Sequence, residues 1–210
     1  MNAARLLVDK LEKLGTKNHI DLTGGQIDKL LRMDEWVVKW NRSISLIGFA
    51  NDAERIDRFF IEAVHAATWL PKNGNAIDIG SGGGSPALPM AVCRPDICWT
   101  LLEPNQRKKV FLEEISTELS LKQIHVVRQR YEHYQPKTKV RVVTTRGVLM
   151  NMGSIKKMHT WLEAGGQIML LTGDEARDRI ARDIDPPWSI AKEVFLSPRQ
   201  ESRLVVLELT

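Results

Sequence analysis

The chain has 210 residues, of which 43% are hydrophobic and 27% are charged, and it contains 14 glycines and 9 prolines. These values are typical of a globular protein with a full core and exclude collagen-like, coiled-coil and low-complexity chains. The formal net charge of +4 is a mild basic excess, which permits an anionic partner without requiring one. No stretch approaches the roughly 18 apolar residues of a membrane-spanning helix, so we expect a cytoplasmic protein with no membrane partner.

The cysteine pattern argues against a metal site. Cys93 and Cys98 are the only cysteines of the chain. A tetrahedral zinc site needs four ligands, and no third cysteine or histidine lies near these two in the sequence. We therefore expect two reduced, buried thiols and no bound metal.

Three amphipathic helices are predicted in the N-terminal third of the chain. Apolar residues recur at spacings of three and four over residues 3–14, and Gly15 is expected to end this first helix. Thr23 and Gln26 have the spacing of a capping box, which predicts the start of the second helix. Asp52 is expected to cap the third helix.

From residue 71 onward the hydrophobic period changes. Short apolar runs bounded by turn residues alternate with helical segments, which is typical of a parallel, doubly wound α/β sheet. The last two runs are joined by too few residues for a crossover helix, so they predict a terminal antiparallel hairpin. We therefore expect a helical N-terminal extension over residues 1–70 and a Rossmann-like domain over residues 71–210. The expected strands span residues 75–79, 98–103, 124–127, 140–144, 167–171, 188–196 and 202–209, and the expected helices among them span 86–93, 105–119, 153–162 and 174–184.

A glycine-rich loop follows the first predicted strand and provides the strongest local signal. Residues 76–86 read A-I-D-I-G-S-G-G-G-S-P, with glycines at the alternate positions Gly80, Gly82 and Gly84. Such glycines allow a tight turn and close approach of a ligand to the backbone, and the next helix begins with free N–H groups. The dinucleotide fingerprint needs its third glycine where this chain has Ser85, so a pyrophosphate ligand is disfavoured.

An acidic residue ends the next predicted strand. Glu103 lies about 20 residues after the glycine loop, where a carboxylate can accept hydrogen bonds from both hydroxyls of an unphosphorylated ribose. This combination favours an adenosine-containing cofactor. A nucleophile elbow around Ser85 is disfavoured, because the following residue, Pro86, has no N–H to donate to an oxyanion. The Walker A pattern is absent from the sequence, so it offers no obvious apparatus for ATP hydrolysis.

The residues over 78–89, D-I-G-S-G-G-G-S-P-A-L-P, resemble the loop of the RsmG family, also called GidB, whose pattern is close to D-x-G-S-G-A-G-F-P-G-I-P-L. The resemblance covers roughly residues 30 to 175. Its further matching segments occur in the same order, at residues 40–41, 94–96, 101–103, 107–112, 130–132 and 145–147.

This resemblance implies a class I S-adenosylmethionine-dependent methyltransferase fold and methylation of guanine N7 in small-subunit (16S) ribosomal RNA. It implies one set of residues that bind the cofactor: Asp78, Gly80, Ser81, Gly82, Gly84, Glu103, Arg130, Tyr131, Glu132 and Thr145. It implies a second set that binds the RNA substrate: Arg107, Lys108, Lys109 and Arg146. Arg146 is also the expected catalytic, substrate-positioning residue. The oligomeric state stays open, with a monomer as the expectation.

Three segments depart from the family pattern. The family's N-L-T-x-I appears here as Ser45 to Phe49, its H-x-x-D-S appears as Phe59 to Ala63, and the lysine that precedes a glycine after the fifth strand is Thr172. Two alternatives therefore stay open beside the ribosomal RNA methyltransferase. One is a divergent RNA- or ribosome-binding protein with little turnover, and the other is a class I methyltransferase with another substrate.

Overall fold

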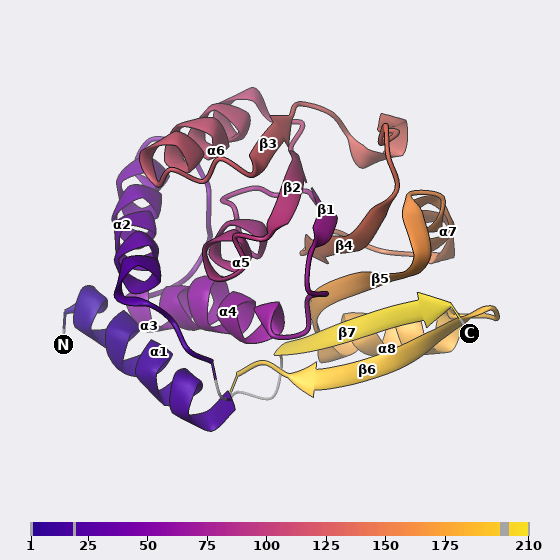
Figure 1. Cartoon of the computed structure of the whole chain (residues 1–210), viewed down its shortest axis with the longest axis horizontal. Coiled ribbons are helices and arrows are strands. Elements are labelled where there is room, and N and C mark those ends of the chain that lie inside the picture. Colours follow the sequence, from indigo (N-terminus) through magenta and orange to yellow (C-terminus); the bar gives the residue numbers. More distant parts are fainter. Residues whose placement is uncertain (1, 19, 198–201, 210) are drawn as a thin grey trace.

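Seven strands form one mixed sheet within the part of the chain that the computed structural model describes, residues 2–18, 20–197 and 202–209. The strands are β1 (Gly74–Ile79), β2 (Ile97–Leu102), β3 (Ile124–Val127), β4 (Val140–Arg146), β5 (Leu162–Gly173), β6 (Trp188–Phe195) and β7 (Ser202–Leu209). Their order across the sheet is β3-β2-β1-β4-β5-β7-β6 (Figure 1). The first five strands pair in parallel, and β7 is antiparallel to both of its neighbours. The predicted parallel sheet with a terminal hairpin is therefore confirmed. The predicted turn of that hairpin includes residues 198–201, which lie outside the described residues.

Helices cover both faces of the sheet (Figure 1). The N-terminal helices lie on one side together with α5 and α6, whereas α7 and α8 pack on the other side against the C-terminal strands. The helical elements are α1 (Ala3–Asn18), α2 (Gly24–Asn41), α3 (Asp52–Arg55), the π-helical η1 (Ile56–Ile61), α4 (Glu62–Ala67), α5 (Ala87–Cys93), α6 (Gln106–Glu118), the 3-10 turn η2 (Tyr131–His133), α7 (Met152–His159) and α8 (Asp174–Asp183).

The alternation of side chains along each strand divides the core into two clusters. Met169 and Leu171 of β5 join the cluster under the N-terminal helices, while Ile168 and Leu170 join the cluster under α7 and α8. Because successive side chains of a strand point to opposite faces, an uninterrupted apolar run can supply both clusters. This is why the central strands read as continuous hydrophobic segments.

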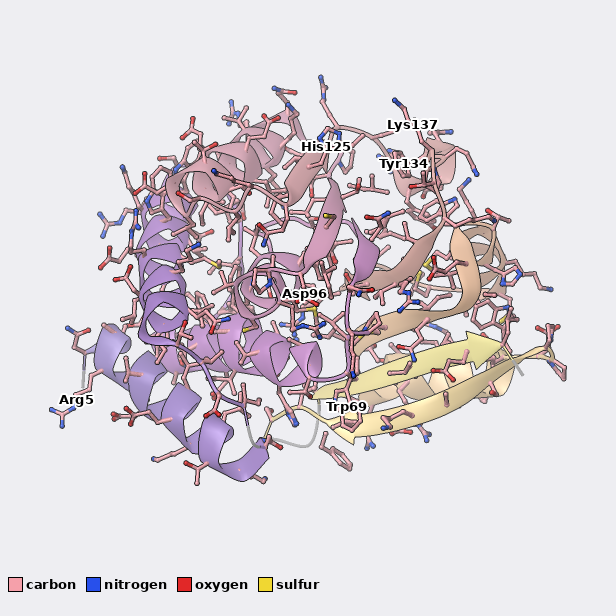
Figure 2. All side chains as sticks on the ribbon, viewed as in Figure 1. Arg5, Trp69, Asp96, His125, Tyr134 and Lys137 are labelled. Atoms are coloured by element: carbon pink, nitrogen blue, oxygen red, sulfur yellow. The ribbon has the colours of Figure 1, made fainter. Side chains whose placement is uncertain are left out.

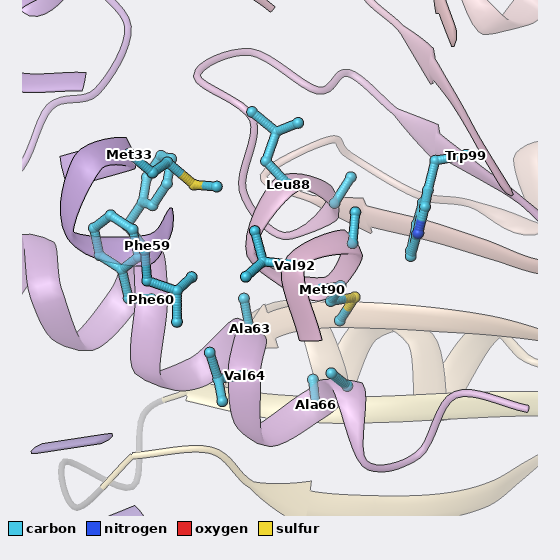
Figure 3. Close-up of a cluster of buried hydrophobic side chains, with 14 of the residues drawn as sticks. Met33, Phe59, Phe60, Ala63, Val64, Ala66, Leu88, Met90, Val92 and Trp99 are labelled. Atoms are coloured by element: carbon cyan, nitrogen blue, oxygen red, sulfur yellow. The ribbon is translucent and has the colours of Figure 1, made fainter. Parts of the chain in front are cut away.

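The N-terminal helices share the first of these clusters with the sheet. Side chains of Phe59 and Phe60 from η1, Leu88 from α5 and Trp99 from β2 lie in the same buried group (Figure 3). The boundary at residue 70 stays a prediction. It falls between α4 and β1, inside one shared core.

The first helix does not end where the sequence suggested. Gly15 remains helical, and α1 continues to Asn18, so the predicted end at Gly15 is wrong. A Cβ atom at Gly15 would lie 2.8 Å from the carbonyl oxygen of Ile20. The glycine therefore permits the returning chain to approach the helix closely, and it does not terminate the helix.

The starts of α2 and α3 are set by side-chain caps. The capping box of Thr23 and Gln26 is confirmed, with both reciprocal hydrogen bonds present. Asn51, and not Asp52, caps α3, because the Asn51 side chain accepts a hydrogen bond of 2.9 Å from the backbone N–H of Glu54. Asp52 is the first helical residue, so this helix begins one position earlier than expected.

Cys98 is exposed and Cys93 is only partly buried, so the prediction that both thiols are buried is wrong. Charged side chains lie over the outer surface. Figure 2 shows Arg5 on α1 and Lys137 before β4 pointing away from the body of the molecule. Among the described residues, none of the helices combines the length and the apolar content that crossing a membrane requires.

Candidate functional site

The candidate site lies at the edge of the sheet where the parallel strands end. Within the sheet, β1 lies between β2 and β4, and the chain passes from β1 to β2. At such a switch point the loops after neighbouring strands diverge and leave a crevice for a ligand. The loops after β1, β2, β3 and β4 contain most of the residues that the sequence singled out.

The glycine loop after β1 has three glycines with positive φ, and they differ in surroundings. A Cβ atom at Gly80 would lie 2.6 Å from Val148, and one at Gly84 would lie 2.4 Å from Leu88. At Gly82, where φ is +54°, the nearest atom to such a Cβ would be the Gly80 carbonyl oxygen at 3.6 Å. Packing therefore excludes side chains at Gly80 and Gly84, whereas Gly82 faces open space where a ligand can approach the backbone.

Glu103 joins the glycine loop to the start of α6. Its Oε2 accepts a hydrogen bond of 2.8 Å from the backbone N–H of Gly82, and its Oε1 accepts one of 2.8 Å from the N–H of Asn105. The residue is only 5% exposed. Each carboxylate oxygen can accept a second hydrogen bond, so the group remains able to bind the two hydroxyls of a ribose.

Asp78 lies at the C-terminal half of β1, directly beside Thr144 in the register of β4. Its Oδ1 accepts a hydrogen bond of 2.6 Å from the Thr144 hydroxyl, while its buried Oδ2 has no hydrogen-bond partner among the described residues. Burial raises the pKa of Asp78 to about 7, although hydrogen bonds from Thr144 and Ser81 oppose this shift. The site thus contains one carboxyl group with an unused oxygen.

Two adjacent threonines, Thr144 and Thr145, lie next to the end of β4 and bind β1 through their hydroxyls. Thr144 was not among the predicted site residues, although its hydroxyl is the partner of Asp78. Thr145 was predicted to bind the cofactor, and here its hydroxyl donates a hydrogen bond of 3.0 Å to the Ile79 carbonyl oxygen. Both residues are buried. The signal for Thr144 is a second hydroxyl residue that directly follows the buried Val142 and Val143.

The predicted adenine-side residues lie in the segment after β3. Arg130 and Glu132 are exposed, and Tyr131 is partly buried, with its hydroxyl 2.9 Å from the Ser154 hydroxyl of α7. This segment lies at the same sheet edge as the glycine loop. Contact of these three side chains with a cofactor stays a prediction.

The predicted basic cluster occupies the first turn of α6. Asn105 caps this helix by accepting hydrogen bonds from the backbone N–H groups of Arg107 and Lys108. Arg107 is exposed and Lys108 is partly buried. The ammonium group of Lys109 is paired with Glu113 at 2.5 Å. Two of the three cations are therefore left for an anionic partner.

Arg146 ends β4 and forms a buried ion pair with Glu62 of α4. The distance between guanidinium nitrogen and carboxylate oxygen is 2.9 Å, and the side chains are 15% and 2% exposed. Arg146 also donates a hydrogen bond to the backbone carbonyl of Arg58. Burial raises the pKa of Glu62, and the charge of Arg146 offsets this only in part. A guanidinium has five N–H groups, so Arg146 keeps donors for a ligand.

Sequence reasoning missed Glu62, which lies in the segment where the chain departs from the family pattern. Residues 59–64 read F-F-I-E-A-V, and the five apolar side chains in this run are all buried in the core. A single carboxylate in such a run needs a cationic partner. That requirement was the available signal, but the partner is 84 positions away.

A cavity of about 260 Å³ lies beside the ends of β4 and β5. Its lining includes the three arginines Arg58, Arg146 and Arg179, together with Glu62 and Thr172. The remaining lining is mainly apolar and comes from the loop after β4, the end of β5 and α8. Sequence reasoning missed this cavity and two of its three arginines.

The comparisons with known proteins agree with the resemblance. The model of the GidB family, described as rRNA small subunit methyltransferase G, matches residues 26–197. The chain belongs to this family. Two RsmG relatives named "Ribosomal RNA small subunit methyltransferase G" cover most of it. The protein from Chromobacterium violaceum is 30% identical over 162 residues, which are 77% of this chain and 78% of the relative. The protein from Helicobacter pylori is 29% identical over 166 residues, which are 79% of this chain and 93% of the relative.

Solved structures confirm the class I methyltransferase fold expected of an RsmG protein. The glycopeptide N-methyltransferase MtfA, complexed with S-adenosylmethionine, superposes with a TM-score of 0.59 at 12% identity and covers 71% of this chain and 93% of its own. A methyltransferase from Thiobacillus denitrificans, in complex with S-adenosylhomocysteine, has a TM-score of 0.59 at 15% identity. The match covers 75% of this chain and 95% of that methyltransferase. At such identities the likeness concerns the fold alone. The roles of the individual site residues stay predictions.

Proposed function

We propose that this RsmG-family protein transfers the methyl group of S-adenosylmethionine to N7 of a guanine in small-subunit (16S) ribosomal RNA. One observation carries the proposal. The glycine loop after β1 is hydrogen-bonded to the Glu103 carboxylate after β2, and Val148, which lies against Gly80 of this loop, also lines the cavity that contains three arginines. Family membership supports the enzyme class and the RNA substrate.

The residues at the ends of β1 and β2 fit the cofactor. Gly82 leaves space for close approach, Glu103 has lone pairs for ribose hydroxyls, and Asp78 has a buried oxygen without a partner. When bound, S-adenosylmethionine supplies a methyl group carried on a positively charged sulfur. The Glu103 carboxylate favours such a cation over an anionic ligand, and Asp78 adds to this preference above its pKa of about 7, where it is ionised.

The substrate needs little acid–base help from the protein. Guanine N7 has an exposed lone pair in the major groove, so the chain has to orient the base and exclude water. The cavity beside Arg146 can do both, because its apolar walls border the glycine loop through Val148. Glu62 acts as a positioning residue by holding the Arg146 guanidinium in place.

The test is methyl transfer from tritiated S-adenosylmethionine to 30S particles and to naked small-subunit ribosomal RNA. Reduction and aniline cleavage at 7-methylguanine then identify the modified base. Incorporation by the wild-type protein that is lost in Arg146→Ala supports the proposal. The control is Arg141→Ala, which removes an exposed arginine from the same strand.

Calorimetric titration with S-adenosylhomocysteine separates the alternatives. Cofactor binding without incorporation into either RNA would contradict the proposed enzyme and favour an RNA- or ribosome-binding protein. Incorporation into a small molecule but not into RNA would favour another methyltransferase substrate.

A further inference from the structure

The arginine-lined cavity carries more positive charge than its own carboxylate neutralises. Arg58, Arg146 and Arg179 line it, and Glu62 is the one acidic residue among the lining residues of the described chain. Glu62 is engaged by Arg146 at 2.9 Å. Two guanidinium groups therefore face the cavity without a carboxylate of its lining to pair with them.

Arg179 of α8 is the least satisfied of the three arginines. Its Nε is buried and has no hydrogen-bond partner among the described residues. By contrast, Arg177 on the same helix pairs with Glu193 of β6 at 2.7 Å and with Asp178 at 2.9 Å. A buried N–H donor of a charged group is costly to leave unpaired, which indicates that an absent acceptor completes this position.

Arg58 lies on the more open side of the same cavity. Its side chain is 52% exposed, and its ion pair with Glu54 is loose, at 3.5 Å. The guanidinium lies over the ring of Phe49, 5.7 Å from the centroid. Arg146, with 15% of its side chain exposed, is more deeply buried. The exposure of the arginines thus increases from Arg146 to Arg58.

We propose that Arg179 and Arg58 bind a phosphodiester group of the RNA that flanks the target nucleotide. The planar fork of a guanidinium matches two oxygens of a phosphate, and it stays charged at every physiological pH. The apolar lining beside Gly147 to Met150 is suited to a base, which brings the attached phosphate towards the arginines. This inference rests on the proposed function, because that function places the RNA in this cavity.

The experiment compares Arg179→Gln with Arg182→Gln in the full chain. Arg182 lies on the same helix and is exposed, and it is not among the residues that line the cavity. Both variants lose one positive charge, so their difference reports the position and not the net charge. Binding of naked small-subunit ribosomal RNA is measured by filter retention at several salt concentrations, with S-adenosylhomocysteine present.

We expect Arg179→Gln to weaken RNA binding about tenfold and to reduce the slope of log affinity against log salt by about 0.7 to 0.9, as expected for one phosphate contact. Arg182→Gln should leave both nearly unchanged. In methyl transfer, Arg179→Gln should raise KM for RNA while kcat and the affinity for S-adenosylhomocysteine stay constant. Arg179→Lys keeps the charge and should restore the salt slope, which also guards against a misfolded glutamine variant.

The outcomes separate this inference from the proposed function. Equal effects of Arg179→Gln and Arg182→Gln overturn the phosphate site, even if the wild-type protein methylates RNA. A position-specific effect on RNA binding without any methyl transfer supports the phosphate site and overturns the proposed enzyme. A wild-type protein that does not bind the RNA at all overturns both.

Discussion

The two halves of the site differ in their buried charged groups, although they share one edge of the sheet. The half beside β1 and β2 contains the carboxyl groups of Asp78 and Glu103 and the open backbone of the glycine loop. The half beside β4 and β5 contains three arginines and a single carboxylate. A cationic cofactor and a polyanionic RNA can therefore meet at one edge while each lies against the opposite charge.

The two halves also differ in how they are assembled. Gly82 and Glu103 are 21 positions apart and belong to consecutive strand-to-helix connections. Arg146 and Glu62 are 84 positions apart and belong to different layers of the fold. The cofactor half is thus a local product of two loops, whereas the arginine half exists only when η1, α4, β4 and α8 pack together.

The largest expected effect concerns Asp78. Because its pKa is raised from 3.8 to about 7, the folded protein keeps a proton that the unfolded chain releases within this window. The free energy of unfolding of the cofactor-free protein should therefore fall as pH rises from 4 to 7, with an upper limit of about 4 kcal/mol. Asp78→Asn should remove this loss and be the more stable protein at pH 8.

Denaturant unfolding between pH 4 and pH 8 measures this difference between wild type and Asp78→Asn. Asp96→Asn is the control of opposite sign. A hydrogen bond from Arg94 lowers the pKa of Asp96, so ionised Asp96 adds to the free energy of unfolding, and this contribution is lost as the pH falls through that pKa. Parallel curves for wild type and Asp78→Asn would show that Asp78 is not a strained, buried carboxyl group.

The next effect concerns the arginine half. Glu62→Ala leaves Arg146 with an uncompensated, largely buried charge, and should lower the free energy of unfolding by about 3 kcal/mol. Glu163→Ala removes the carboxylate of an exposed pair with Arg141 and should cost less than about 1 kcal/mol. Urea unfolding compares the two variants. If assembly of the two halves is independent, Glu62→Ala keeps its affinity for S-adenosylhomocysteine, and a joint loss would refute that independence.

The smallest of the three effects concerns the cofactor half. Gly82→Val places a branched side chain where the backbone is open to a ligand and should weaken binding of S-adenosylhomocysteine about 100-fold, as measured by calorimetry. Gly165→Val is the matched control, since Gly165 also has a positive φ and open surroundings but lies in β5 away from the site. Both variants bear similar backbone strain, of about 1–2 kcal/mol. Equal cofactor affinities would show that the loop is not the binding position.

Local sequence signals were sufficient for much of the fold and for the positions of the glycine loop and Glu103, whose contact with a cofactor stays a prediction. The capping box of Thr23 and Gln26, the glycine loop and Glu103 each depend on neighbours within one or two connections. Backbone geometry and short-range hydrogen bonds determine such features, so they can be predicted from neighbouring residues without knowledge of the long-range packing.

Other positions were misjudged or missed because their partners come from distant segments. Gly15 is the exception, because its partner is only five residues away: it has the signature of a helix end, yet the close carbonyl of Ile20 explains why a glycine stands there. The role of Thr144 depends on its contact with Asp78, and the role of Glu62 depends on its ion pair with Arg146. The pairing of these groups depends on strand register and on helix packing, neither of which a single sequence displays.

The amino-acid order alone was enough to indicate the family, the parallel sheet with its terminal hairpin and the glycine loop with its carboxylate, since each depends on contiguous spacing and periodicity. Packing of η1, α4, β4 and α8 around one cavity determined which charges are paired and which are left over. The reason is physical: whether a buried charge is satisfied depends on what lies within a few ångströms of it, and distance in space is independent of distance along the chain.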